Sequence, residues 1–178
     1  MPSSTASMSP PFREPPVVTG RATFSRDHRY RTSLARRWGE GPRVCWVMLN
    51  PSTADATQDD PTLRRCIAFA RAWGAGGIEV VNLFALVSTD PRRLLTESDA
   101  AGAANGAAVA RAAGRADLVV AGWGNLPPAL IARAASAMQQ LPEESWCLGL
   151  TAQGQPRHPL YVAAKTERVP FRSASGLR

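Results

Sequence analysis

The chain has 178 residues and is 44 % hydrophobic, which is sufficient for one domain with a single core. No apolar stretch approaches the ~20 residues that a membrane span needs. The N-terminal region lacks the apolar core of a signal peptide, so we expect a cytoplasmic protein without a membrane partner. The 21 basic residues outnumber the 14 acidic ones, and all except Lys165 are arginines. Arginine suits phosphate, which keeps nucleic acid among the expected partners, although a GC-rich genome also gives this composition.

The cysteines and histidines give no sign of a metal site. Cys45, Cys66 and Cys147 are far apart, lie in apolar segments and form no CxxC pair. The two histidines, His28 and His158, are also widely separated. We therefore expect no metal and no disulfide, with the three cysteines as buried free thiols.

The N-terminal half begins with a tail and continues into a domain. Residues 1–18 are rich in Ser and Pro, and we expect a disordered or loosely packed tail there. The domain, 19–178, starts with an arginine-rich segment, 19–37, that predicts a strand or hairpin. Residues 43–49 are a continuous apolar run, as in a strand covered on both faces. After a polar loop, Asp60-Pro61 is typical of a helix start.

Strands and helices then alternate to the C-terminal region. Glycines at 74–77 end the first helix and precede a strand at 78–84. Residues 88–91 predict another helix start, 100–114 an alanine-rich helix, 117–122 a strand, 127–140 a helix and 145–150 a fourth strand. This order predicts an α/β fold: a three-layer α/β/α sandwich with a mostly parallel four-stranded central sheet.

Polar or turn-forming segments follow the predicted strands at their carboxyl ends. The first strand runs into Asn50-Pro51-Ser52, and the second contains Asn82. Trp123 follows the third between two glycines, and His158 lies in a loop after the fourth. Ligands of open α/β sheets bind outside these ends, so we expect Asn50, Asn82, Trp123 and His158 to line one pocket. The standard nucleotide-cofactor motifs do not occur, and no cofactor is expected.

Several of these residues also have structural interpretations. Asn-Pro-Ser is common turn chemistry, and Asn82 could be satisfied by backbone within its strand. Alternatively, the Asn82 amide could read the edge of a base. Phe84 could stack on a planar ligand or fill the core. Among the loop carboxylates Asp55 is the candidate general base if its environment raises its pKa, whereas helix capping accounts for Asp60.

Two family resemblances are carried by these segments. The chain closely resembles a bacterial and phage family classed as domain of unknown function 1643. The segments that carry this match are Met48–Asp55, Asp60–Thr62, Val81–Phe84, Gly122–Gly124 and Arg157–Tyr161. Their order is also similar to that of the uracil-DNA glycosylase superfamily, particularly its mismatch-specific branch.

The glycosylase resemblance implies a fold of that superfamily and a role for each matching residue. Asn50 would hold the attacking water, with Pro51 and Ser52 beside it, and Asn82 would read the flipped base. His158 would stabilise the charge that develops on the leaving base. Leu160 or Tyr161 would act as a wedge in DNA.

The resulting hypothesis is a DNA-binding, glycosylase-like hydrolase that acts on a damaged or modified base. Arg64, Arg65 and Arg157 are the candidate phosphate contacts, and a monomer is expected. Two alternatives stay open. One is a non-catalytic module that binds nucleic acid or nucleotides, and the other is a hydrolase or transferase acting on free nucleosides or nucleotides.

Overall fold

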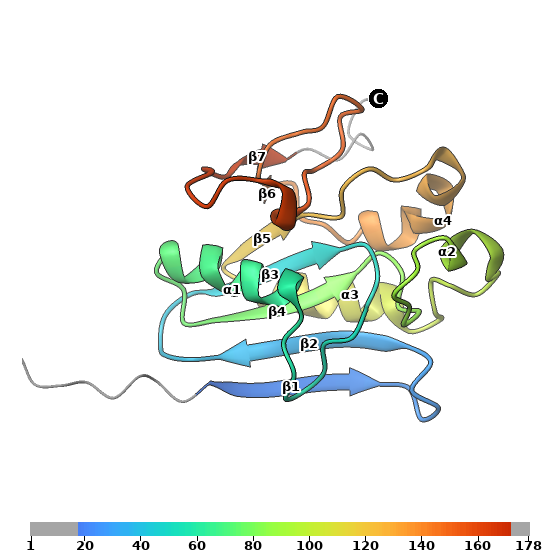
Figure 1. Cartoon of the computed structure of the whole chain (residues 1–178), viewed down its shortest axis with the longest axis horizontal. Coiled ribbons are helices and arrows are strands. Elements are labelled where there is room, and N and C mark those ends of the chain that lie inside the picture. Colours follow the sequence, from blue (N-terminus) through green and yellow to red (C-terminus); the bar gives the residue numbers. More distant parts are fainter. Residues whose placement is uncertain (1–17, 172–178) are drawn as a thin grey trace, which may run out of the picture.

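A computed structural model describes residues 18–171. The tail expected over residues 1–18 therefore lies, apart from Val18, outside the described residues. The described residues form one seven-stranded sheet in the order β1-β2-β4-β3-β5-β6-β7 (Figure 1). The strands are β1 (Thr19–Phe24), β2 (Arg31–Arg37), β3 (Arg43–Met48), β4 (Gly77–Asn82), β5 (Leu118–Ala121), β6 (Ser145–Cys147) and β7 (Val169–Phe171).

The sheet is mixed and larger than the four-stranded sheet expected from the sequence. β3 pairs in parallel with β4 and β5, and β5 pairs in parallel with β6. The β1–β2 hairpin adds to β4, and β7 adds to β6, both in antiparallel orientation. β7 escaped prediction because three residues that include Pro170 carry no period-two pattern.

Within residues 18–171, four α-helices and one short 3₁₀ helix connect the strands. They are α1 (Pro61–Ala72), α2 (Arg93–Thr96), α3 (Asn105–Gly114), α4 (Pro128–Met138) and η1 (Pro159–Tyr161). α1 starts as predicted, because the Asp60 side chain accepts a 2.7 Å hydrogen bond from the Leu63 amide. α3 starts later than the predicted residue 100. There the Asn105 side chain donates to the carbonyls of Asn82 and Leu83, which ties the helix start to the end of β4.

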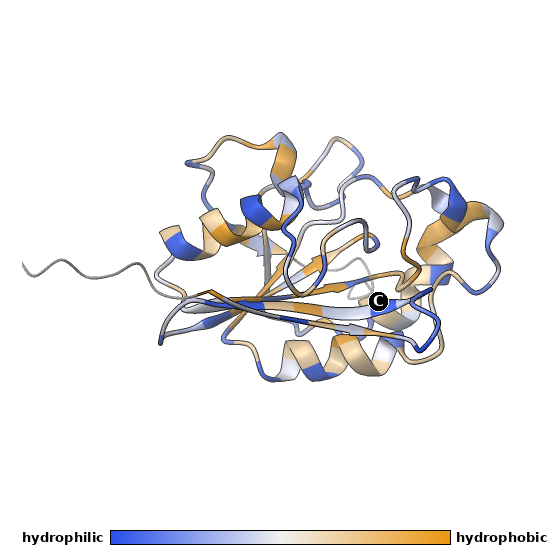
Figure 2. Cartoon of the chain, turned by 60° about the horizontal axis from the view of Figure 1, so that its bottom comes forward, coloured by the Kyte–Doolittle hydropathy of each residue, from blue (hydrophilic) through white to orange (hydrophobic). Residues whose placement is uncertain are grey.

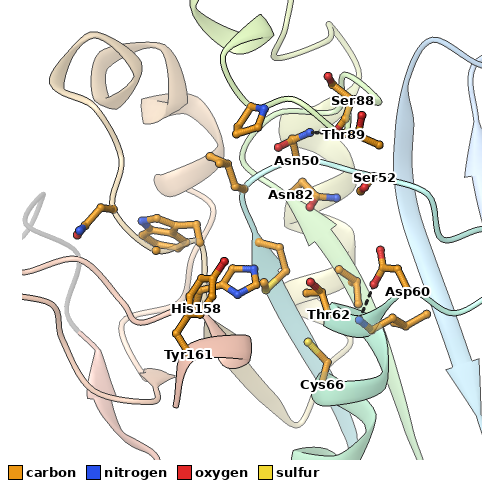
Figure 3. Close-up of a pocket in the computed structure, with 18 of the residues that line it drawn as sticks. Asn50, Ser52, Asp60, Thr62, Cys66, Asn82, Ser88, Thr89, His158 and Tyr161 are labelled. Atoms are coloured by element: carbon orange, nitrogen blue, oxygen red, sulfur yellow. Dashed lines mark hydrogen bonds between the residues drawn. The ribbon is translucent and has the colours of Figure 1, made fainter.

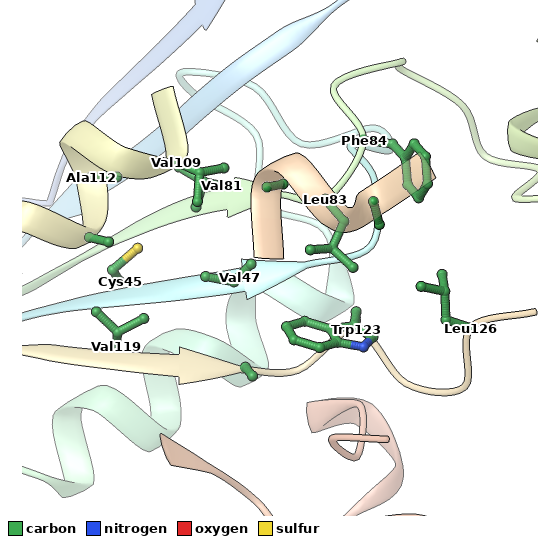
Figure 4. Close-up of a cluster of buried hydrophobic side chains, with 14 of the residues drawn as sticks. Cys45, Val47, Val81, Leu83, Phe84, Val109, Ala112, Val119, Trp123 and Leu126 are labelled. Carbon is green, nitrogen blue, oxygen red and sulfur yellow. The ribbon is translucent and has the colours of Figure 1, made fainter. Parts of the chain in front are cut away.

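Helices cover both faces of the sheet (Figure 2). Alternate residues of a strand point to opposite faces, so Val44, Trp46 and Met48 of β3 pack with α1. Cys45 and Val47 pack instead with α3 and α4, in the cluster drawn in Figure 4. The continuous apolar run in β3 is thus explained by burial on both sides, as the sequence predicted.

Candidate functional site

A cavity of about 740 Å³ opens at the carboxyl ends of β3 and β4, where His158 and Tyr161 face Asn82 and Asp60 (Figure 3). Its walls include Asn50, Asn82, Trp123 and His158, which the sequence predicted to meet. Four segments separated by up to about a hundred residues along the chain therefore contribute to one site. Ser52, Arg157 and Tyr161 line it as well.

Asn50 is held in a fixed orientation by the backbone around it. Its Nδ2 donates to the carbonyl oxygens of Pro51 and Ser88 at 2.9 and 2.8 Å. The Ser88 amide in turn donates to the Pro51 carbonyl, which joins the loops after β3 and β4. Because both donors of the amide are engaged with backbone, its Oδ1 is the atom left to accept a hydrogen bond from a ligand or water.

Asn82 ends β4 and is almost completely buried, with 1 % of its surface exposed. Its Nδ2 is buried and has no hydrogen-bond partner within residues 18–171, although the side chain lines the cavity. A buried donor without a partner costs free energy. A ligand that presents an acceptor to Nδ2 would remove that cost, which distinguishes Asn82 from an ordinary core asparagine.

His158 is placed as a neutral hydrogen-bond donor. Its Nδ1 accepts from the Leu160 amide at 3.3 Å and so caps η1, which assigns the proton to Nε2. Burial lowers the pKa of His158 below its ordinary value of 6.5, and the negative charge of Asp60 opposes this only in part. The imidazole is therefore uncharged at neutral pH and has one donor to offer.

Two glycines let the His158 loop approach the end of β5. A Cβ on Gly122 would lie 3.1 Å from Met48 Sδ and 3.3 Å from Pro159 Cδ, closer than packing readily allows. Gly124 has φ of +77°, which favours glycine. Between them, Trp123 donates from Nε1 to Gln155 Oε1 at 2.9 Å and is itself buried. Trp123 is thus a rigid wall of the cavity.

Asp55 and Phe84 do not line this cavity. The Asp55 carboxylate accepts from the amides of Thr57 and Gln58, and these bonds lower its pKa instead of raising it as a general base requires. Phe84 is fully buried in the cluster shared with α3 and α4, so its core-filling alternative is the one the structure adopts (Figure 4).

Four further predicted residues lie around the cavity without lining it. Pro51 is buried, and Leu160 is 39 % exposed on η1. Arg64 is exposed and donates to the Asp59 carbonyl. Arg65 donates to the carbonyls of Pro159 and Val162, and so fastens α1 to the His158 loop.

Two charged residues that sequence reasoning missed do line the cavity. Asp60 caps α1 as expected, but its carboxylate also faces the cavity, so capping does not exhaust its role. Arg31, the first residue of β2, is buried with 4 % exposure. The sequence did not indicate that Arg31 is buried, because it is one of many arginines in 19–37. The residues around it in the cavity come from distant segments of the chain.

The described residues 18–171 contain no group of three or more His, Cys, Asp or Glu that could hold a metal ion. All three cysteines are free and buried, as predicted. Cys66 lines the cavity, and its burial raises the pKa of the thiol well above the ordinary value, which disfavours a thiolate.

Within residues 18–171, every helix is too short or too polar to cross a membrane.

One family comparison identifies the chain. The family described as "Protein of unknown function (DUF1643)" matches residues 29–160, which include β2 to β6 and every cavity residue named above except Tyr161. The chain belongs to this family. Searches of curated proteins and of solved structures found no match.

Proposed function

We propose that this DUF1643 protein accepts a nucleobase in the cavity and hydrolyses its N-glycosidic bond, with DNA as the substrate polymer. The observation that supports this most is the meeting of Asn50, Asn82 and His158 in one cavity of about 740 Å³. Such a volume suits a ligand the size of a nucleotide. A base can occupy it only after leaving the helical stack. The proposed fold likeness to uracil-DNA glycosylases belongs to the same hypothesis.

Each polar side chain of the cavity can form a hydrogen bond with a different part of the substrate or with the attacking water. The free Nδ2 of Asn82 suits a carbonyl oxygen or ring nitrogen of the base. His158 donates through Nε2 to an oxygen on which negative charge develops as the base departs. Asn50 Oδ1 accepts a hydrogen bond from the attacking water. The site therefore recognises a base with an acceptor on each of two edges.

The reaction needs little base strength if the glycosidic bond breaks first. The bond between C1′ and the base nitrogen breaks, and its electron pair leaves with the base. The water oxygen then bonds to C1′, and the proton released from the water ends on the departed base. Asp60, rather than Asp55, is the carboxylate placed to stabilise the positive charge on the sugar.

Surface residues at the cavity mouth suit a DNA strand. Tyr161 is 82 % exposed, and its ring lies 5.4 Å from that of His158. Arg157 is exposed and lines the cavity. Tyr161 and Leu160 are the proposed wedge, and Arg157 and Arg64 the proposed phosphate contacts. Binding through such contacts weakens steeply as salt rises, and a flat response to salt would favour the free-nucleotide alternative.

The test uses oligonucleotides that each carry one modified base, scored for abasic sites by alkaline cleavage. Wild-type protein should generate abasic sites at one or a few modifications. Asn50→Ala and His158→Ala should slow this by roughly 10²–10³-fold, the usual cost of one lost oriented group at a charged transition state. Asn82→Asp should change which base is accepted, because an oxygen replaces the buried donor.

Asp55→Asn is the matched control. It alters a carboxylate of the same loop that does not line the cavity, and its rate should equal that of wild type. Absence of abasic sites across the whole panel contradicts the glycosylase proposal. It would leave the non-catalytic alternative, in which the same cavity binds a nucleotide without cleaving it.

A further inference from the structure

Arg31 is a buried cation whose hydrogen-bonding capacity is only partly used. Its Nη1 donates to the Ala54 carbonyl, while its Nε is buried and without a partner within residues 18–171. The side chain lines the cavity that holds Asn50 and Asn82. Burial of an arginine without full pairing is costly, because a guanidinium group presents five donors.

The charges around Arg31 leave it short of a counterion. Burial lowers its pKa to about 10, Asp60 and Asp55 oppose this shift, and Arg36 adds to it. Arg31 nevertheless stays charged at neutral pH. Among the described residues, no carboxylate lies within ion-pair distance of it, whereas Arg36 pairs with Asp59 at 2.7 Å. The negative charge of Asp55 is occupied by the amides of Thr57 and Gln58.

Neighbouring groups in the cavity wall suit an oxyanion. Ser52 and Thr62 supply hydroxyl groups that line the same cavity. Thr62 lies in the first turn of the twelve-residue helix α1, where the helix dipole favours negative charge. Asp60 shares this wall and repels an anion, but its Oδ1 is already engaged with the Leu63 amide.

We propose that Arg31 forms a phosphate subsite inside the cavity, so that the ligand is a nucleoside phosphate and not a base or nucleoside alone. Arg31 binds the phosphate oxygens through its planar fork. The nucleoside portion of this ligand rests on the proposed function. The phosphate portion rests on the contact with Arg31. The phosphate comes either from the DNA strand beside a flipped base or from a free nucleotide.

The test compares ligands that differ only in the phosphate. Dissociation constants are measured by calorimetry for inorganic phosphate, for 2′-deoxynucleosides with different bases, and for their 5′-monophosphates. Wild-type protein should bind at least one monophosphate roughly 10- to 100-fold tighter than its nucleoside, as one charged hydrogen-bonded contact provides. Arg31→Met should abolish that ratio and leave nucleoside affinity in place, and Arg31→Lys should retain part of it.

Arg21→Met is the matched control, since it removes the same charge from an exposed position on β1 and should keep the wild-type ratio. An unchanged ratio in Arg31→Met overturns the inference, as does a wild-type protein that binds no phosphate probe. Equal weakening of nucleoside and monophosphate binding also overturns it, because Arg31 would then only support the loop.

Short single strands that carry an internal phosphodiester identify the source of the phosphate. Tighter binding of these strands favours DNA, and tighter binding of monophosphates favours a free nucleotide. Phosphate binding without abasic sites would remove the glycosylase proposal alone.

Discussion

Two buried arginines of β2 reach under the same loop, 51–60, but only one of them is matched by protein groups. Arg36 donates from Nε to the Asp59 carboxylate at 2.8 Å and from Nη2 to the carbonyls of Asp55 and Gln58. Arg31 donates to the Ala54 carbonyl, and its buried Nε has no partner in the described part of the chain. Arg36 therefore belongs to the frame of the loop, meaning the side chains whose hydrogen bonds hold residues 51–60 in place, whereas Arg31 belongs to the cavity.

The same contrast separates other polar groups of the two regions. Frame residues such as Arg36 are expected to stabilise the fold, so their replacement should lower the free energy of unfolding. In the cavity, Arg31 and Asn82 each keep a buried donor that has no partner among residues 18–171, and such local inconsistency is typical of functional sites. Loss of either of these two side chains should alter ligand binding, while the unfolding free energy changes little.

The largest expected effect is the loss of stability on replacing Arg36, which holds the loop 51–60. Arg36→Met should lower the free energy of unfolding by about 2–4 kcal/mol, since it leaves Asp59 and two loop carbonyls without their donor. Urea denaturation measures this loss. Arg37→Met, on the same strand, is the control and should change stability by less than about 0.5 kcal/mol. Similar values for the two variants would show that the Arg36 network does not hold the loop.

A somewhat smaller loss is expected at the junction of β4 and α3. Asn105→Ala removes donors to the carbonyls of Asn82 and Leu83, at 2.8 and 3.1 Å, in a buried position. Unsatisfied buried carbonyls predict a loss of about 1–3 kcal/mol. Thermal melting measures it. If stability is unchanged, the end of β4 does not depend on Asn105 for its position.

Arg31→Met should change the unfolding free energy by no more than about 1 kcal/mol in either direction. The lost bond to Ala54 is offset by removal of an incompletely paired buried charge. The same urea experiment provides the number. A loss as large as that of Arg36→Met would contradict the contrast between the two arginines and make both part of the frame.

The smallest effect is a dependence of stability on pH that comes from His158. Its pKa is lowered in the folded protein, so its contribution to stability is complete above about 6.5 and decreases as the pH falls below that value. Protonation also removes the acceptor that Nδ1 offers to the Leu160 amide. His158→Asn should flatten this part of the pH profile, measured by urea denaturation between pH 5 and pH 8. An unchanged profile would assign the dependence to other groups.

Much of the fold could be predicted from patterns of neighbouring residues in the sequence. The apolar run of β3, the start of α1 at Asp60 and the hairpin of β1 and β2 each depend on neighbours along the chain. The short β7 was not predictable, because it becomes a strand only by pairing with β6. The shift of the α3 start to Asn105 likewise depends on carbonyl groups more than twenty residues away.

The sequence was sufficient to predict that Asn50, Asn82, Trp123 and His158 meet, because residues after parallel strands reach the same edge of a sheet. The charged residues that line the cavity could be assigned only from the folded structure. It placed Asp60 there instead of Asp55, and it added Arg31. The burial and pairing of a charged side chain depend on groups that are distant along the chain and that only folding brings together. Nothing in the run of arginines along β2 distinguishes Arg31 from Arg36 until the loop 51–60 is packed over them.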